Sequence, residues 1–552
     1  MSISLSRNQQ QNNIQNKPFK KTLSPSFKGV TACLDYFATN PVWGATATDV
    51  TSMGAPRTYI DGKNRGFSGG FETGFREFSS TGNDAAIGAY GLLAGTAIAG
   101  MVKPMGLKDP QRIFASNDSV DLHNAKWQAN GGNIDKFIDD YVESLHGFNP
   151  NDAKADVNGY VKISDAHKDV IKSDLKTLSD TSLSKKDRKV VFKRLKARLL
   201  EATGADNQLL LKHGDKSIEA ESTTILDDFF RLTKAFREKK PSVDSDKLVS
   251  KIKSFGKYRA LLGLGLAMAI SSATQPLNVY LTKKRTGSDG FAGMPDRKKD
   301  NSFNFKMLKL ASATAMTGLA LATMKAKPSQ VLSKVMYKAP IPSIDQFKAL
   351  FGVTIISRML VARDKDELRE TDTKDMLGFL NWLIIGNLIN KGVLMKMEDK
   401  NNPLVKISEA DKNKKGIGGA ISRFFNSNIA SRKEVLVDGL QKEGKSAIKE
   451  NGVAKTLTEM LKELPKNSAA RKNIKLLNIA QGINYAYTIA VLGLGIPKLN
   501  IFLTNKAQKK RNERKQKLIM ENVMTANNQQ FVLNHSGMNV FASFKETKTK
   551  KM

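Results

Sequence analysis

Two long stretches of this chain contain no charged side chain, and they restrict the fold more than any other feature. They run from Ala85 to Val102 and from Ala260 to Leu281. At about 1.5 Å per residue, a helix of this length nearly crosses the ~30 Å hydrocarbon core of a bilayer. Both stretches are therefore predicted to be membrane-spanning helices.

Four further apolar stretches are candidate spans, although each carries polar or charged residues. They are Met307 to Met324, Phe347 to Ala362, Met376 to Met395 and Leu476 to Leu503. Polar groups are costly in lipid, so those inside the stretches are expected to face other helices or a water-filled cavity. The candidate intramembrane polar residues are Lys348, Arg358, Asn381, Asn387, Gln481 and Asn484.

Small residues recur at every fourth position in the two uncharged stretches. Gly91, Gly95 and Ala99 form one such stripe, and Gly263 begins another that continues through Ala267 and Ser271. Stripes of this kind let a second helix approach closely in lipid, although general richness in Gly and Ala gives the same pattern.

The predicted fold class is all-α: a multi-pass membrane helix bundle with about six spans, two helical soluble insertions and a disordered N-terminal tail. The tail is rich in Gln and Asn and too polar to form a core. The predicted segments are 1–27 disordered tail, 28–84 Gly-rich pre-membrane region, 85–102 first span, 103–257 basic helical insertion, 258–395 membrane region with about four spans, 396–473 second helical insertion, 474–505 last span and 506–552 basic C-terminal tail.

Both insertions show helical periodicity and recognisable helix starts. Asn133 precedes an amphipathic stretch, and Ser184 with Asp187 has the spacing of a helix N-terminus. No strand is predicted in either insertion.

A different interpretation is that the apolar stretches are buried helices of a large soluble α protein. The mean hydropathy of −0.36 is compatible with that class. Two uncharged stretches of near-spanning length favour the membrane instead.

The net charge of +35 indicates affinity for anionic surfaces, either lipid or nucleic acid. A basic amphipathic helix is predicted around residues 185–199. The alternative is a solvated helix that packs one apolar stripe on the rest of the insertion. The candidate contacts with anionic lipid are Lys189, Lys193 and Arg194.

No catalytic, cofactor-binding or metal-binding residues are predicted. The five histidines lack the spacing of a helical metal pair, and neither a phosphate-binding loop nor a nucleophile turn is present. Cys33 is the only cysteine, which excludes an intrachain disulfide. The protein is therefore expected not to be an enzyme.

Charged residues also gather among the glycines just before the first predicted span, from Arg57 to Glu77. These charges could line a polar vestibule or pair locally, and Glu72 with Arg76 has the spacing of an intrahelical ion pair. None of the six apolar stretches contains an acidic residue. This absence disfavours a proton-driven transporter, because such pumps use intramembrane carboxylates.

A short sequence is echoed at the ends of two predicted spans. Leu277 to Thr282 reads Leu-Asn-Val-Tyr-Leu-Thr, and Leu499 to Thr504 reads Leu-Asn-Ile-Phe-Leu-Thr. Chance can produce this match in a long chain, but the shared placement suggests a duplicated exit from the membrane.

Three functions of different classes fit these observations. A membrane scaffold or remodelling protein ranks first, because the chain offers close-packing helices and basic surfaces without a catalytic grouping. A transporter or channel and a membrane-tethered nucleic-acid binder are the alternatives. The expected partners are anionic membrane lipid and other membrane helices, including a second copy of the chain, with nucleic acid as a further candidate.

We expect the full-length protein to stay in the membrane pellet after alkaline carbonate and high-salt washing. These treatments remove electrostatically bound proteins but not apolar spans. Immunoblotting of pellet and supernatant measures the outcome, and release of most of the protein would contradict the membrane interpretation.

Overall fold

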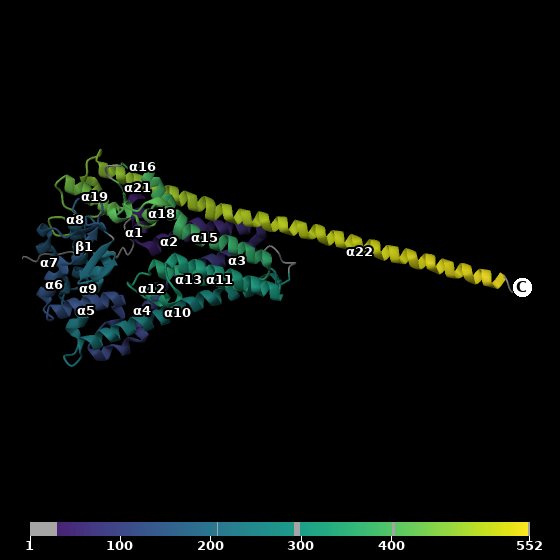
Figure 1. The fold of residues 1–552 in the computed structure, drawn as a ribbon, viewed down its shortest axis with the longest axis horizontal. Coiled ribbons are helices and arrows are strands. Elements are labelled where there is room, and N and C mark those ends of the chain that lie inside the picture. The colour runs from purple at the N-terminus through teal and green to yellow at the C-terminus, as the bar shows by residue number, and fades with distance from the viewer. Residues whose placement is uncertain (1–29, 207, 292–297, 400–402, 550–552) are drawn as a thin grey trace, which may run out of the picture.

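The computed structural model describes residues 30–206, 208–291, 298–399 and 403–549, and 74% of it is helical. The predicted all-α class is thus confirmed in its coarse form. Figure 1 shows the insertions at one end of the molecule and a bundle of long helices leading away from them. The longest helix, α22 (Ile496–Thr549), extends well beyond the body. The predicted disordered tail, 1–27, lies outside the described residues.

The bundle is built from the described residues that lie outside the two insertions. Its other helices are α1 (Val30–Thr39), α2 (Pro41–Thr48), α3 (Ala55–Ala85), α4 (Ile87–Ala97), α10 (Ser245–Thr286), α11 (Phe303–Met324), α12 (Val331–Val335), α13 (Ile344–Val361), α14 (Lys365–Thr371), α15 (Leu377–Leu380), α16 (Gly386–Met397) and α21 (Ala469–Thr488).

Three helical segments are long and apolar enough to cross a membrane: α10, α11 and the continuous helical run Ala469–Thr525, which joins α21 to α22. They contain three of the six predicted spans. Only 33%, 22% and 33% of their apolar windows is buried inside the protein. Helices at the centre of a soluble α protein would be buried on most sides. The exposure therefore supports membrane association.

The other three predicted spans require correction, so about six spans is not confirmed. The stretch Ala85 to Val102 forms only the 11-residue α4, followed by short 3₁₀ turns, because frequent glycines weaken the helix. The stretch Phe347 to Ala362 lies largely in α13, which carries three charged residues. The stretch Met376 to Met395 is divided between α15, a π-helical turn and α16.

α3 is a hairpin rather than one straight helix. It reverses at Gly66, whose φ of 70° and ψ of −174° belong to a region open almost only to glycine. A Cβ on Gly70 would lie 3.0 Å from the Gly62 Cα in the opposite arm. Thr73 donates a hydrogen bond of 2.5 Å across the hairpin to Asp61. The glycines thus bring the two arms, and the charges they carry, into close contact.

The small-residue stripes of α4 and α10 meet at Gly91 and Gly263. A Cβ on Gly263 would lie 3.1 Å from the Gly91 Cα and 2.8 Å from the Tyr337 hydroxyl. Tyr337 donates a hydrogen bond of 2.9 Å to the Ile87 carbonyl and so holds the same junction. The close approach depends on the missing side chains.

The first insertion contains a small sheet that the sequence did not predict. Its strands are β1 (Leu145–Phe148), β2 (Tyr160–Lys162), β3 (Leu209–His213) and β4 (Lys216–Ala220), in the antiparallel order β2-β1-β3-β4. β1 is buried throughout, so its sequence shows no alternation of apolar and polar residues. The surrounding helices are α5 (Asn117–Ala129), α6 (Ile134–Glu143), α7 (Asp165–Ser179), α8 (Lys185–Thr203) and α9 (Ser222–Glu238).

Two helix starts in this insertion are confirmed. The Asn133 side chain accepts hydrogen bonds from the backbone of Asp135 and Lys136, and Ser184 accepts one from the Asp187 backbone. These caps satisfy amide groups that a helix leaves unpaired at its N-terminus.

The second insertion packs against the first. The Glu434 carboxylate accepts a hydrogen bond of 2.8 Å from the Asp206 backbone, and Gln441 donates one of 2.8 Å to the Glu201 carbonyl. Its elements are β5 (Val405–Lys406), α17 (Glu409–Lys412), α18 (Gly416–Asn426), β6 (Asn428–Ile429), α19 (Arg432–Lys442) and α20 (Leu457–Glu463). Both insertions therefore lie at one end of the bundle.

We expect Gly263→Val to lower the free energy of unfolding by about 1–3 kcal/mol, because the new side chain would overpack the α4–α10 contact. Thermal unfolding in detergent, followed by helical circular dichroism, measures the change. Gly265→Val is the matched control, because a Cβ there meets nothing within 4 Å. Equal effects of the two substitutions would contradict the close contact.

Candidate functional site: a polar cavity and a layer of buried charges

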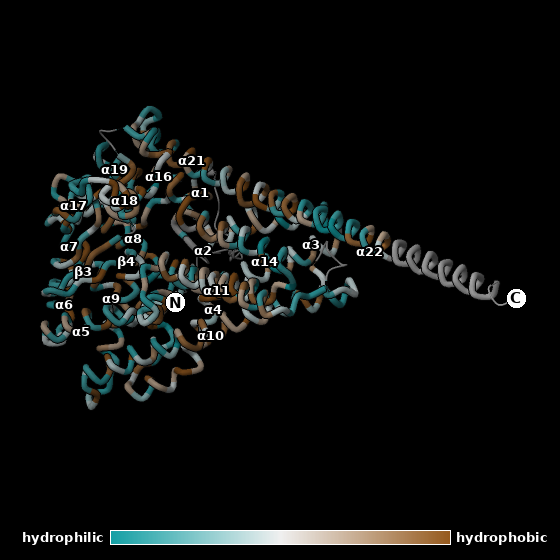
Figure 2. Tube along the Cα trace, turned by 45° about the vertical axis from the view of Figure 1, so that its right-hand side comes forward, coloured by the Kyte–Doolittle hydropathy of each residue, from teal (hydrophilic) through white to brown (hydrophobic). Residues whose placement is uncertain are grey.

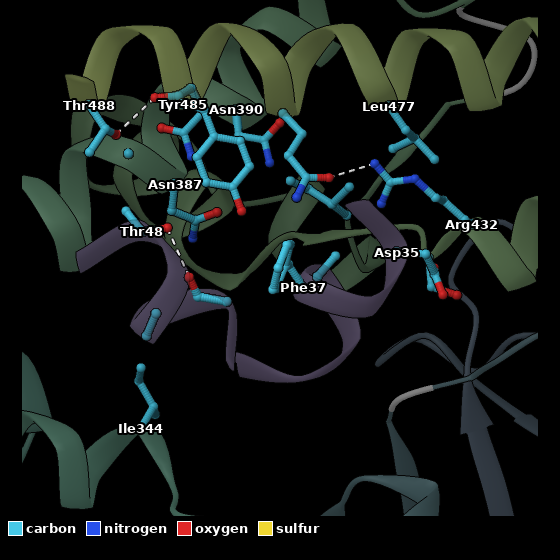
Figure 3. Close-up of a pocket in the computed structure, with 18 of the residues that line it drawn as sticks. Asp35, Phe37, Thr48, Ile344, Asn387, Asn390, Arg432, Leu477, Tyr485 and Thr488 are labelled. Carbon is cyan, nitrogen blue, oxygen red and sulfur yellow. Dashed lines mark hydrogen bonds between the residues drawn. The ribbon is translucent and has the colours of Figure 1, made fainter. Parts of the chain in front are cut away.

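A cavity of about 540 Å³ lies in the bundle beside the second insertion, between α1, α2, α16 and α21. Five of the six predicted intramembrane polar residues line it; they are Lys348, Asn381, Asn387, Gln481 and Asn484. Figure 3 shows Asn387, Asn390 and Tyr485 on one side of this cavity, with Arg432 and Asp35 on the other.

Helical spacing explains why these residues share one cavity. Four residues of α21 line the cavity from one face of the helix, because they are spaced by about one helical turn. They are Gln481, the adjacent pair Asn484 and Tyr485, and Thr488. A π-helical turn at Asn381–Ile385 leads into α16 at the point where that helix meets the cavity. Turns of this kind often mark functional positions in helices.

Some polar groups of the cavity bind one another, and others do not. Arg432 donates hydrogen bonds to the side-chain oxygens of Gln481, at 2.5 Å, and Asn478, at 2.9 Å. Within the described residues, the side-chain oxygens of Asn390 and Asn484 are buried without a hydrogen-bond partner. Unpaired buried acceptors are unfavourable unless water or a ligand satisfies them.

The sixth predicted residue, Arg358, belongs to a different group, a layer of buried charges next to the cavity. Arg358 lies 3.1 Å from the Asp375 carboxylate and 3.8 Å from that of Glu77. Glu77 also pairs with Arg57 at 3.5 Å and with Lys374 at 2.8 Å. All five side chains are at least about nine-tenths buried.

Neighbouring cations surround the central carboxylate. The side-chain nitrogens of Lys374, Arg358 and Arg57 all lie within 4 Å of the Glu77 carboxylate and offset the unfavourable burial of its charge. Glu77 is therefore the common partner of several buried cations.

The charged layer brings carboxylates into the bundle from outside the six apolar stretches. Glu77 lies in the α3 hairpin, within the predicted pre-membrane region. Asp375 immediately precedes the predicted span Met376 to Met395. Glu72, which the sequence pairs locally with Arg76, also forms an ion pair with Arg363 of a distant segment. A count of acidic residues restricted to the apolar stretches overlooks Glu77 and Asp375. The sequence feature that points to such a layer is the set of opposite charges among the glycines of residues 57–77.

The cavity and the charged layer lie at successive depths along the same helices. On the α21–α22 run, Thr488 lines the cavity, the Leu492 carbonyl accepts a 3.3 Å hydrogen bond from Arg57, and Asn500 lies beyond. The twelve residues from Thr488 to Asn500 rise about 18 Å. The charges therefore separate the cavity from the far end of the bundle.

The predicted lipid contacts on α8 lie in the first insertion. Lys189 and Lys193 are exposed, whereas Arg194 pairs with Asp174 at 2.6 Å. The apolar stripe of α8, Val191, Leu195 and Leu199, is buried in the core of the insertion. This packing matches the alternative of a solvated helix, and contact of the two lysines with lipid stays a prediction.

Comparison with known proteins adds no relative. No family model matches the chain, and no curated protein or solved structure is significantly similar to it. Within the described residues, no group of three or more His, Cys, Asp or Glu side chains could hold a metal ion.

We expect Glu77→Gln to lower the free energy of unfolding by about 3–5 kcal/mol, because it leaves buried cations without their shared carboxylate. Thermal unfolding in detergent measures the effect. Glu459→Gln is the control, because its ion pair with Lys449 is partly exposed in the second insertion. A Glu77→Gln protein as stable as the control would show that the layer contributes nothing to the fold.

Proposed function

We propose that the protein is a multi-pass integral membrane protein of the transporter or channel class, which admits a small polar solute to the cavity beside the second insertion. The cavity is the observation that carries the proposal. Its volume of about 540 Å³ falls within the range of ~300–1,000 Å³ typical of small-molecule sites.

Membrane insertion is supported by the surface of the apolar helices. Leu310 on α11 and Phe502 on α22 are 54% and 61% exposed, and further large apolar side chains on these helices and on α10 are also exposed. Figure 2 shows this apolar colour along the helices of the bundle. Surfaces of this kind are stable in lipid and promote association in water.

The chemistry of the cavity suits a neutral or zwitterionic polar solute. Asn387, Asn390 and Asn484 offer amide groups, each with donors and an acceptor, while Arg432 and Asp35 place charges of both signs at the same cavity. Polar groups within membrane segments are expensive, and they commonly mark a substrate or ion pathway.

The charged layer removes the main argument against transport. A proton-driven transporter was disfavoured because no carboxylate lies in the apolar stretches, yet Glu77 and Asp375 are buried within the bundle. π-helical turns also interrupt the helices around the layer, at Asp49–Gly54, Asp372–Met376 and Ile489–Gly495. π-helical turns of this kind are frequent at functional sites.

A membrane scaffold is the second candidate. It is supported by α22, which continues beyond the apolar region as an exposed basic helix that includes Lys506, Lys509 and Arg514. Anionic lipid or an acidic partner would suit that helix.

The test is osmotic swelling of proteoliposomes in urea, glycerol, glycine or ribose, followed by light scattering. We expect faster swelling than in protein-free liposomes with at least one solute. The double variant Asn387→Leu, Asn484→Leu should abolish the difference, because leucine has a similar volume but no polar group.

Neither asparagine side chain makes a hydrogen bond within the described residues, so the double variant should fold. Asn304→Leu, at an exposed position of α11, is the matched control and should swell like the unmodified protein. Equal swelling of the unmodified protein and the double variant with all four solutes would overturn the proposal.

A further inference from the structure

Two distant parts of the chain share a sequence pattern. Arg65 is followed at the seventh position by Glu72-Thr73 and then by Arg76-Glu77. Arg363 is followed at the seventh position by Glu370-Thr371 and then by Lys374-Asp375. Three positions are identical and two conserve their charge, at one constant offset. The echo of Leu277–Thr282 in Leu499–Thr504 follows later in each half.

The two copies exchange ion pairs. Arg65 of the first copy lies 2.5 Å from the Glu370 carboxylate of the second, and Arg363 of the second copy pairs with Glu72 of the first. Phe291 lies between the arginines, with its ring centre 5.4 Å from one guanidinium carbon and 6.0 Å from the other. A reciprocal exchange of this kind is what two-fold related halves produce.

Each echoed sequence contacts the glutamate of its own copy, and the two contacts are equivalent. Asn278 donates a hydrogen bond of 3.0 Å to the Glu72 carbonyl, and Asn500 donates one of 3.0 Å to the Glu370 carbonyl. Thr504 also donates to the Glu370 carboxylate at 2.5 Å. Each half therefore runs from a segment that carries the arginine and the glutamate, through an insertion, to a long helix whose asparagine binds that glutamate.

We propose that the chain consists of two homologous halves, and that the reciprocal pairs Arg65–Glu370 and Arg363–Glu72 form a gate that closes the far end of the solute pathway. We call these four residues the clamp. The inference rests on the proposed function, because a gate needs a cavity to close.

The position of the clamp supports this role. Lys374 and Asp375 in the charged layer lie one helical turn from Glu370, so the clamp is farther from the cavity than the layer is. Only about 30 Å³ of free space remains among the clamp side chains, room for a water molecule but not for a solute. Both pairs join one half to the other, so movement of the halves apart would break both together.

The experiment measures access to the cavity from each side of a sealed vesicle. A reporter, Asn484→Cys in a Cys33→Ser background, is labelled with the impermeant anion 2-sulfonatoethyl methanethiosulfonate. Ser217→Cys, exposed in the first insertion, and Lys284→Cys, exposed near the far end, identify the two sides in parallel samples.

In the unmodified clamp, we expect labelling of the reporter from the insertion side only. Glu370→Gln should raise the labelling rate from the far side about tenfold or more, and Glu72→Gln should do the same because the pairs are equivalent. The charge exchange Arg65→Glu with Glu370→Arg should restore closure. Asp438→Asn, which breaks an exposed pair with Lys442, is the control and should change nothing.

Arg65→Lys and Arg363→Lys carry the test if the glutamine variants do not fold. Each guanidinium contacts two carboxylates at once, Asp61 and Glu370 for Arg65 and Glu367 and Glu72 for Arg363, and lysine keeps the charge but not the planar group that reaches both. Far-side labelling unchanged in every clamp variant would overturn the gate while the proposed function stands. A reporter that labels from neither side would instead overturn the cavity as a solute site.

Discussion

The fold depends on the neutralisation of charge inside a bundle whose outer surface is apolar. An isolated ion in such an interior is unfavourable by several kcal/mol or more, so a buried carboxylate needs cations in contact. Glu77 has Arg57 and Lys374 beside it, from two different segments of the chain. Arg57 belongs to the α3 hairpin itself, and residues 358–375 supply the other opposite charges, so the same contacts hold both segments in the bundle.

The glycines of the hairpin let its two arms pack closely. A Cβ on Gly70 would lie 3.0 Å from the Gly62 Cα and push the arms apart, and the ion pair of Arg57 with Glu77 joins the same two arms. The result is a polar interior within an apolar exterior, which suits lipid because the exterior contacts hydrocarbon while the interior supplies its own polar partners. A water-soluble protein has the opposite arrangement.

Sequence reasoning succeeded where one helix can be understood by itself. Length and apolarity located α10, α11 and the α21–α22 run. It failed where the outcome depends on tertiary contacts. The Ala85 to Val102 stretch has the composition of a span, yet its helix ends at Ala97, and the carboxylates of the bundle come from segments too polar to be predicted inside it.

The two halves differ at the end that carries the cavity, and the difference bears on its purpose. In the first half, α4 and α10 close with Gly91 against Gly263, and Tyr337 fills the junction. In the second half, the corresponding helices α16 and α21 carry Asn387, Asn390 and Asn484 at their junction and leave a large polar space. The junction of the first half is closed, because glycines bring α4 and α10 together and the side chains of Tyr337 and buried Arg259 fill the remaining space. The open, asparagine-lined junction of the second half is what the proposed binding of a polar solute requires. The clamp, by contrast, takes an arginine and a glutamate from each half, as expected if it joins the two halves.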